Sequence, residues 1–144
     1  MSSSILKLSE FRQHGHAACV ACIHPELKLD FVLSGPDALH SSIDFTEEMC
    51  SFNGHVHGGV LAFVVDQAVT CMLLAKETYA VTGELKLRYK KPVQPRQTAH
   101  VEVALERTCG QLSKVRATVR QGGEDCVLAK ASMMAEELRS SSGV

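Results

Sequence analysis

The sequence contains no apolar run long enough to cross a membrane and no excess of charge of either sign. The longest run, Val60 to Val65, is followed by Asp66 and Gln67, whereas a transmembrane helix needs about 20 predominantly apolar residues. The formal net charge is −1, so the chain as a whole has no attraction for nucleic acid or for an anionic lipid surface. We therefore expect neither a membrane nor a nucleic acid as a partner.

A secretory signal and low-complexity segments are also missing. The first residues, MSSSILKLSEFRQ, lack the basic start, apolar block and small-residue cleavage site of a signal peptide, which predicts a cytoplasmic protein. The 144 residues are 45% hydrophobic and 22% charged, which excludes a disordered or fibrous chain. No internal repeat is visible, and only the ends are rich in serine. The sequence thus predicts one domain over residues 1–144, with its core at about 17–137.

Alternation of apolar and polar residues predicts an antiparallel sheet. LKLDFVL has a period of two, and the turn SGPD separates it from the weaker strand candidate ALHSSIDF, so the two segments predict a hairpin. Four later segments, ELKLRYK, HVEVALER, LSKVRATVR and CVLAKASMM, alternate in the same way, with the turn segments PVQP, TCGQ and QGGED between them. Because these connections are short, consecutive strands should be antiparallel neighbours.

One apolar block predicts a long central helix. Residues 59 to about 78 have room for about five helical turns. Their apolar residues lie on all sides, so we expect the helix to be buried. The predicted fold class is therefore α+β, with a curved antiparallel sheet wrapped around one long central helix.

The stretch that leads into this helix carries the most specific motif. G-H-V-H-G-G precedes the helix, Asp66 lies nine positions after His57, and T-G-E-L-K-L-R-Y-K-K-P follows. This combination, over about residues 17–137, resembles hotdog-fold acyl-CoA thioesterases of the phenylacetate-degradation (PaaI-like) type. The leader CVACIHPELKLDF is also similar to that of some bacterial members. The resemblance implies a hotdog fold and hydrolysis of an acyl-CoA to a free acid and coenzyme A, and we expect no cofactor and no metal.

The two glycines after His57 predict an oxyanion site at the helix start. The first four N–H groups of a helix have no intrahelical partner, and the helix dipole adds positive potential there. Of the Gly58 and Gly59 N–H groups, that of Gly58 is the predicted donor to a thioester carbonyl, a role that the resemblance also implies. His57 either orients the substrate or holds the loop by hydrogen bonding. A glycine turn without a catalytic role is the alternative.

The resemblance also implies the remaining site residues. Thr82 supplies a hydroxyl group, which can hydrogen-bond to a carboxylate or to water. Some relatives carry an amide side chain six residues before the motif histidine. That position is Ser51 here, so either Ser51 or Asn53 supplies the second polar contact. The residues implied to line the acyl-CoA groove, with outward strand positions as the alternative, are Glu84, Tyr89 and Arg107.

Basic residues are concentrated in the second half of the chain. Residues 81–120 include nine Lys and Arg against three Glu. A basic strand region beside the active cleft would suit the phosphates of coenzyme A, which arginine can hold through two hydrogen bonds at once, and a solvated sheet face is the alternative. Leu61 and Val65 are candidates for lining an acyl tunnel. The nine cations are Lys86, Arg88, Lys90, Lys91, Arg96, Arg107, Lys114, Arg116 and Arg120.

A cluster of Cys and His near the N-terminus supports a rival function from another class. Cys19 and Cys22 form a C-x-x-C pair beside His14, His16 and His24, and such an arrangement can bind zinc or carry out redox chemistry. A second C-x-x-C pair is missing, so a metal or redox module is the weaker hypothesis. A non-catalytic acyl-CoA-binding domain is the other alternative. The cysteines expected to be packed in the core or in strands are Cys50, Cys71, Cys109 and Cys126.

The carboxylate of Asp66 predicts an assembly. A charge among apolar neighbours is costly unless it is paired or solvated, and Asp66 is too far into the helix to cap it. At about 1.5 Å per residue it lies about 13 Å from the oxyanion site of its own chain, whereas reacting groups approach to about 3–3.5 Å. Antiparallel helices in a homodimer would bring Asp66 of one chain to Gly58 of the other. We therefore predict a dimer, assembled further into a tetramer, with Asp66 as general base or nucleophile.

Overall fold

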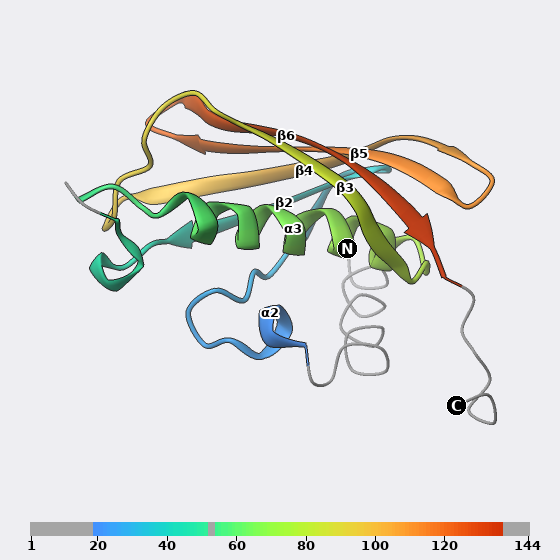
Figure 1. Ribbon diagram of the computed structural model, residues 1–144, viewed down its shortest axis with the longest axis horizontal. Helices are drawn as coiled ribbons and strands as arrows, with labels where there is room; N and C mark the ends of the chain where they lie inside the picture. The colour runs from blue at the N-terminus through green and yellow to red at the C-terminus, as the bar shows by residue number, and fades with distance from the viewer. Residues whose placement is uncertain (1–18, 52–53, 137–144) are drawn as a thin grey trace.

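The computed structural model describes residues 19–51 and 54–136, which form one sheet, one long helix and a leader at residues 19–31 (Figure 1). The helices are α2 (Val20–Ile23), a short 3-10 helix (Glu47–Met49) and α3 (Gly58–Ala75). The strands are β1 (Val32–Gly35), β2 (Ala38–Asp44), β3 (Ala80–Tyr89), β4 (Thr98–Cys109), β5 (Leu112–Gln121) and β6 (Glu124–Ala135). The predicted fold class, an antiparallel sheet with one long central helix, is confirmed.

All six strands belong to one antiparallel sheet in the order β1-β2-β4-β5-β6-β3, so β1 and β3 are its edges. The four alternating segments of the second half form β3 to β6. Their alternation has a direct cause, because every second residue of β5, from Ser113 to Gln121, is buried. A turn at Gly122 and Gly123, with φ of 62° and 77°, joins β5 to β6 in a conformation that glycine adopts readily.

Helix α3 lies across one face of the sheet, which we name the inner face, and contacts β3, β4, β5 and β6 (Figure 1). Ten of its 18 residues are buried. The opposite side of α3 carries half-buried or exposed residues three or four positions apart, the open stripe, formed by Gly59, Ala62, Phe63, Asp66 and Thr70. The prediction of a buried central helix is confirmed, and the open stripe remains because one sheet covers only one side of a helix.

The leader packs on α3 through the side chain of Gln67. Gln67 Oε1 accepts a hydrogen bond from the Leu29 N–H, and Nε2 donates to the Leu27 carbonyl, both over 2.8 Å. Leu29 and Phe31 are buried although β1 begins only at Val32. The alternation of LKLDFVL thus reflects packing of the leader as well as strand pairing. The predicted hairpin is present as the β1–β2 pair, but its first strand is shorter than predicted because β1 begins only at Val32.

By length and composition alone, α3 could cross a membrane, with a mean hydropathy of 1.8. However, 56% of it is buried inside the fold, as in a core helix. The apolar helix is longer than the uninterrupted apolar run Val60–Val65, because it continues past Asp66 and Gln67 to Ala75. Gln67 is buried and forms hydrogen bonds to the leader.

Candidate active site

The start of α3 is held by a compact loop that ends at His57. The backbone N–H of Val56 donates to the Val93 carbonyl, and that of His57 donates to the Met49 carbonyl, each over 2.9 Å. His57 is the N-cap of α3, and its Nδ1 accepts a hydrogen bond of 2.8 Å from the Gly59 N–H. Two roles were predicted for His57, and this contact fits the second, in which His57 holds the loop by hydrogen bonding.

The capping bond leaves the Gly58 N–H as the donor available at the helix start. No acceptor within residues 19–51 or 54–136 hydrogen-bonds to it, whereas the Gly59 N–H is occupied by His57. The Tyr89 hydroxyl donates to the Gly58 carbonyl over 2.9 Å and places an aromatic ring beside this glycine. The predicted oxyanion donor thus lies half-buried at the N-terminus of an 18-residue helix, with no acceptor among the described residues.

A hydrogen bond of 2.7 Å from Thr82 Oγ1 to Asp66 Oδ1 brings together two predicted site residues. Asp66 is exposed in the single chain, so the expectation that its carboxylate is surrounded by apolar side chains is corrected. The reason is its place on the open stripe, opposite the buried neighbours Val65 and Ala68. The arrangement gives a carboxylate with one fixed hydrogen-bond donor and one open side.

A β-bulge in β3 directs Thr82 toward α3. Thr82 faces Met133 and Glu84 faces Ser132 on β6, so Gly83 is an additional residue between two consecutive pairs. A Cβ atom at Gly83 would lie 3.3 Å from the Ser132 carbonyl oxygen, tighter than most real contacts. The bulge changes the side-chain alternation, so Thr82 meets α3 while Glu84 lies on the opposite, outer face of the sheet.

Asp66 and Gly58 of one chain are too far apart to act on one thioester. They are eight residues apart on α3, which corresponds to about 12 Å along the helix axis. Reacting atoms must approach to about 3–3.5 Å. A site that uses both groups therefore needs a second chain.

A hollow of about 200 Å³ lies beside Asp66, between α2 and α3. Leu61 and Val65, predicted to line an acyl tunnel, are instead buried in the core on the sheet side of α3 and do not line it. Phe63 and Thr70 were not predicted as site residues, although their positions three before and four after Asp66 place them on the same helix face. The residues that border the hollow include Cys19, Cys22, Phe63, Asp66, Gln67 and Thr70.

The other predicted site residues are divided between two regions. Ser51 lies in the loop before α3, where its Oγ donates to the His55 carbonyl over 3.3 Å, and Asn53 lies outside the described residues. Tyr89, the last residue of β3, contacts the start of α3 through its hydroxyl group, whereas Glu84 and Arg107 border a hollow of about 240 Å³ on the outer face. Their contact with substrate stays a prediction.

The Cys and His cluster forms no metal site within the described part of the chain. In residues 19–51 and 54–136, no group of three or more His, Cys, Asp or Glu is placed to hold a metal ion. His14 and His16 lie outside these ranges. His24 Nδ1 accepts hydrogen bonds from the backbone N–H groups of Glu26 and Leu27, both over 3.1 Å, so this ring stabilises a turn.

The chain is similar to one family and to several solved structures. The model of the Thioesterase superfamily matches residues 53–128. The PaaI protein of the Escherichia coli phenylacetic acid degradation operon is 13% identical, with a TM-score of 0.80 over 94% of this chain and 97% of that one. Thioesterase superfamily member 2 of Mus musculus is 18% identical, with a TM-score of 0.74 over 94% and 98%.

A structure with a bound ligand is also similar. A Streptococcus mutans protein bound to acetyl-CoA is 18% identical, with a TM-score of 0.72 over 78% of this chain and 91% of that one. A search of curated proteins found no match.

Proposed function

We propose that this chain, which belongs to the thioesterase superfamily and is a thioester hydrolase with the hotdog fold, hydrolyses an acyl-CoA to a free acid and coenzyme A. The observation that carries the proposal is the Asp66–Thr82 hydrogen bond beside an open hollow. The similar Streptococcus mutans structure is bound to acetyl-CoA, and a similar Streptococcus pneumoniae thioesterase is bound to coenzyme A.

Two mutant structures of the Streptococcus pneumoniae thioesterase lend further support. One replaces an aspartate with alanine and the other replaces a threonine with alanine, at positions 16 residues apart. Asp66 and Thr82 are also 16 residues apart. We infer that this pair forms part of the active site in the present chain.

The proposed reaction uses one group from each chain of a dimer. Asp66 of one chain takes a proton from water, and the resulting hydroxide attacks the thioester carbon. The Gly58 N–H of the other chain donates to the carbonyl oxygen as negative charge develops there. The C–S bond then breaks, and the coenzyme A sulfur leaves with the proton that Asp66 had taken from water. Alternatively, Asp66 attacks the carbon itself, the C–S bond breaks to release the coenzyme A thiolate, and water hydrolyses the resulting anhydride and supplies a proton to the sulfur.

The surface of the single chain supports a dimer. The open stripe carries the half-buried Phe63 and the exposed Asp66 on neighbouring turns of α3, and β3 is a sheet edge with the exposed residues Val81 and Tyr89. Pairing two β3 edges would remove this edge and place two α3 helices antiparallel. We propose a dimer, with two dimers forming a tetramer. Light scattering at micromolar concentration tests this, and a stable monomer would exclude a shared site.

The hollow beside Asp66 is the proposed site for the acyl group. A volume of about 200 Å³ corresponds to roughly seven groups the size of a water molecule. A short or an aromatic acyl group has a similar number of heavy atoms, so either could fit. A panel of acyl-CoAs assayed for thiol release tests this. Thr70→Leu should reduce turnover of the larger acyl groups more than that of acetyl-CoA, because the added side chain narrows the hollow. No turnover of any acyl-CoA would favour a non-catalytic acyl-CoA-binding domain.

Hybrid dimers test the shared site directly. Asp66→Asn should keep the fold and lose about a hundredfold in turnover, on the scale of a general base. Gly58→Pro removes the N–H and adds a ring, and the helix should still form, because proline is favoured at the first helical position and His57 already has the extended backbone that precedes proline. Mixing the two variants should restore about a quarter of wild-type activity, since half the dimers are hybrids with one intact site.

A matched control separates the lost donor from added bulk. Gly58→Ala keeps the N–H, and its Cβ would lie an ordinary 3.5 Å from the Tyr89 ring, so this variant should stay active. Hybrids of two folded, inactive variants that show no recovery would rule out the cross-chain arrangement.

A further inference from the structure

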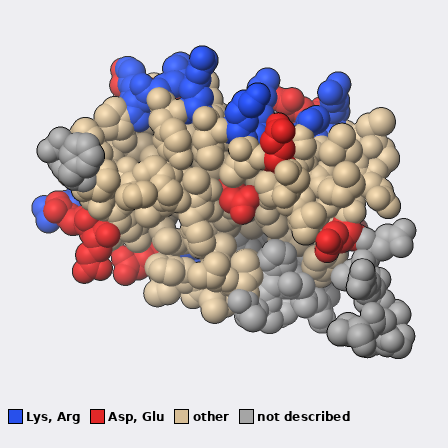
Figure 2. All heavy atoms as spheres, viewed as in Figure 1, with Lys and Arg blue, Asp and Glu red and all other residues tan. Residues whose placement is uncertain are grey.

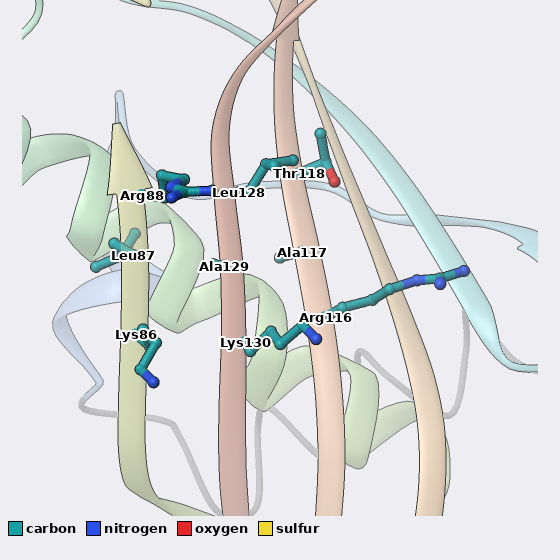
Figure 3. A pocket seen from close by; sticks show the side chains of 9 residues that line it. All are labelled: Lys86, Leu87, Arg88, Arg116, Ala117, Thr118, Leu128, Ala129 and Lys130. Carbon is teal, nitrogen blue, oxygen red and sulfur yellow. The ribbon is translucent and has the colours of Figure 1, made fainter. Parts of the chain in front are cut away.

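Two cysteines that the proposed hydrolysis does not use border the hollow beside Asp66. Cys19 and Cys22 lie on the leader, and both line this hollow together with Asp66 of α3. On the outer face of the sheet, the hollow of about 500 Å³ drawn in Figure 3 and the smaller one of about 240 Å³ have no cysteine among the described residues on their borders. The cysteine pair is thus placed where the acyl group is proposed to bind.

The backbone brings Cys19 and Cys22 within the range of a disulfide bond. Cys19 is the N-cap of α2, and the Cys22 N–H donates to its carbonyl over 3.1 Å, so one helical turn joins the two residues. Residues three positions apart in such a turn have Cα atoms about 5 Å apart, and disulfides join Cα atoms about 4.4–6.8 Å apart. Because both side chains border one hollow, they also lie on the same side of the turn. The bond can therefore form with little movement of the backbone.

The turn that carries the two cysteines is held less firmly by packing than the rest of the leader. α2 has no buried residue, and its Val20 and Ile23 are exposed. By contrast, Leu29 and Phe31 are buried, and Gln67 holds that part of the leader through two hydrogen bonds. A covalent link across the turn would therefore fix a wall of the hollow that packing leaves less constrained.

We propose that Cys19 and Cys22 form a reversible disulfide, with an organic disulfide such as glutathione disulfide as the oxidant. One cysteine thiolate attacks a sulfur of glutathione disulfide, which forms a mixed disulfide and releases one glutathione thiolate. The other cysteine thiolate then attacks the protein sulfur of the mixed disulfide and releases the second glutathione. The protein loses two electrons and two protons, glutathione disulfide gains them, and excess glutathione reverses both steps.

The disulfide should change which acyl groups the hollow admits, an effect that rests on the proposed function. Lys and Arg lie along the upper edge of the molecule in Figure 2, where the sheet lies in Figure 1, whereas the surface over α2 and α3 is mostly uncharged. An uncharged acyl group suits this side, and its fit depends on how far the walls of the hollow can move. Oxidation fixes one wall, so turnover of larger acyl groups should fall more than that of acetyl-CoA.

Mass spectrometry after treatment with glutathione disulfide tests the bond itself. Tryptic cleavage releases one peptide, residues 13–28, that contains Cys19 and Cys22 and no other cysteine. This peptide should lose the mass of two hydrogen atoms and resist iodoacetamide, and dithiothreitol should reverse both changes. Alkylation of both cysteines would overturn the proposal, and so would a link from this peptide to the one that contains Cys71, which borders the same hollow.

Single variants provide the matched controls. Cys19→Ser and Cys22→Ser should each stop at the mixed disulfide, so the peptide should gain the mass of one glutathione. Cys109→Ser changes a cysteine at the end of β4, away from the leader, and should form the disulfide like the wild type. Loss of the disulfide in Cys109→Ser would overturn the assigned pairing.

Turnover of acyl-CoAs of increasing size tests the effect on the hollow. Treatment with glutathione disulfide should lower the turnover of a large acyl-CoA relative to acetyl-CoA at least about threefold in the wild type and in Cys109→Ser. The ratio in Cys19→Ser/Cys22→Ser should not respond to the treatment. An unchanged ratio in oxidised wild-type protein would overturn the effect on the hollow. If the reduced protein hydrolyses no acyl-CoA, the proposed function fails, and the mass measurement still decides whether the disulfide forms.

Discussion

Replacing Thr82 with valine removes one hydroxyl group and keeps the shape of the side chain. The hydroxyl donates a 2.7 Å hydrogen bond to Asp66, which fixes one carboxylate oxygen and leaves the other for water. A hydrogen bond to a charged group contributes about 1.5–3 kcal/mol, and about 1.4 kcal/mol corresponds to tenfold in rate. If the bond holds Asp66 in its reactive orientation, Thr82→Val should therefore lower kcat by about 10- to 150-fold.

The assay is thiol release from an acyl-CoA, with kcat and KM determined separately. KM should stay near the wild-type value, because orientation of the base affects the transition state rather than binding of the substrate. The free energy of unfolding in urea should fall by no more than about 1.5–3 kcal/mol, the contribution of the lost hydrogen bond. Thr82→Ser keeps the hydroxyl and should retain most activity. A kcat for Thr82→Val within twofold of wild type, or an equal loss in Thr82→Ser, would refute the reasoning.

Three further predictions concern the rest of the fold. Gln67→Leu breaks two buried hydrogen bonds to the leader and should lower the free energy of unfolding in urea by about 2–4 kcal/mol, and a loss below about 0.5 kcal/mol would contradict this. Burial raises the pKa of the Cys126 thiol, so at pH 8 it should react with iodoacetamide about tenfold more slowly than exposed Cys109, as followed by mass spectrometry, with the difference abolished in urea. The hydrogen bond from Arg120 holds the pKa of Asp125 below its ordinary value, so the stability from this pair is present at neutral pH and is lost as pH falls through the lowered pKa. Arg120→Gln should return the Asp125 pKa to the ordinary range in an NMR titration, and an unchanged pKa would show that the guanidinium is not its cause.

The hotdog fold and the thioester hydrolase family are both confirmed. They could be predicted because the alternating strand segments, the apolar helix block and the glycine motif before it all indicated the same fold. The strands of the second half alternate over much of their length, since one side of each packs on α3 and the other faces outward. β5 alternates throughout, whereas the bulge at Gly83 interrupts the alternation of β3. The helix end was predicted less well. α3 stops at Ala75, because Glu77 adopts a positive φ of 58°, and no proline or glycine in the sequence marks this turn.

The arrangement of the candidate site depended on contacts between distant segments. The pairing of Asp66 with Thr82 was expected only through the family resemblance. The two residues are 16 positions apart and lie on different elements, so no helix or strand periodicity in the sequence relates them. The hollow beside Asp66 was not predicted, since it exists only where Gln67 holds the leader against α3. The basic strands were predicted to lie beside the active cleft, but Lys86 and its partners line the outer face.

The bulge at Gly83 makes the length of β3, as well as its composition, a determinant of function. Side chains two positions apart on a regular strand share a face, so Thr82 and Glu84 would point the same way if Gly83 were an ordinary paired residue. Loss of the Gly83 codon would make Thr82 and Glu84 consecutive residues, which lie on opposite faces of a regular strand and could keep their partners Met133 and Ser132. Loss of a codon in the regularly paired part of β3, residues 85–89, would instead exchange the faces of one part of the strand relative to the other. In genetic terms, the Gly83 codon should be the one whose loss this strand tolerates best.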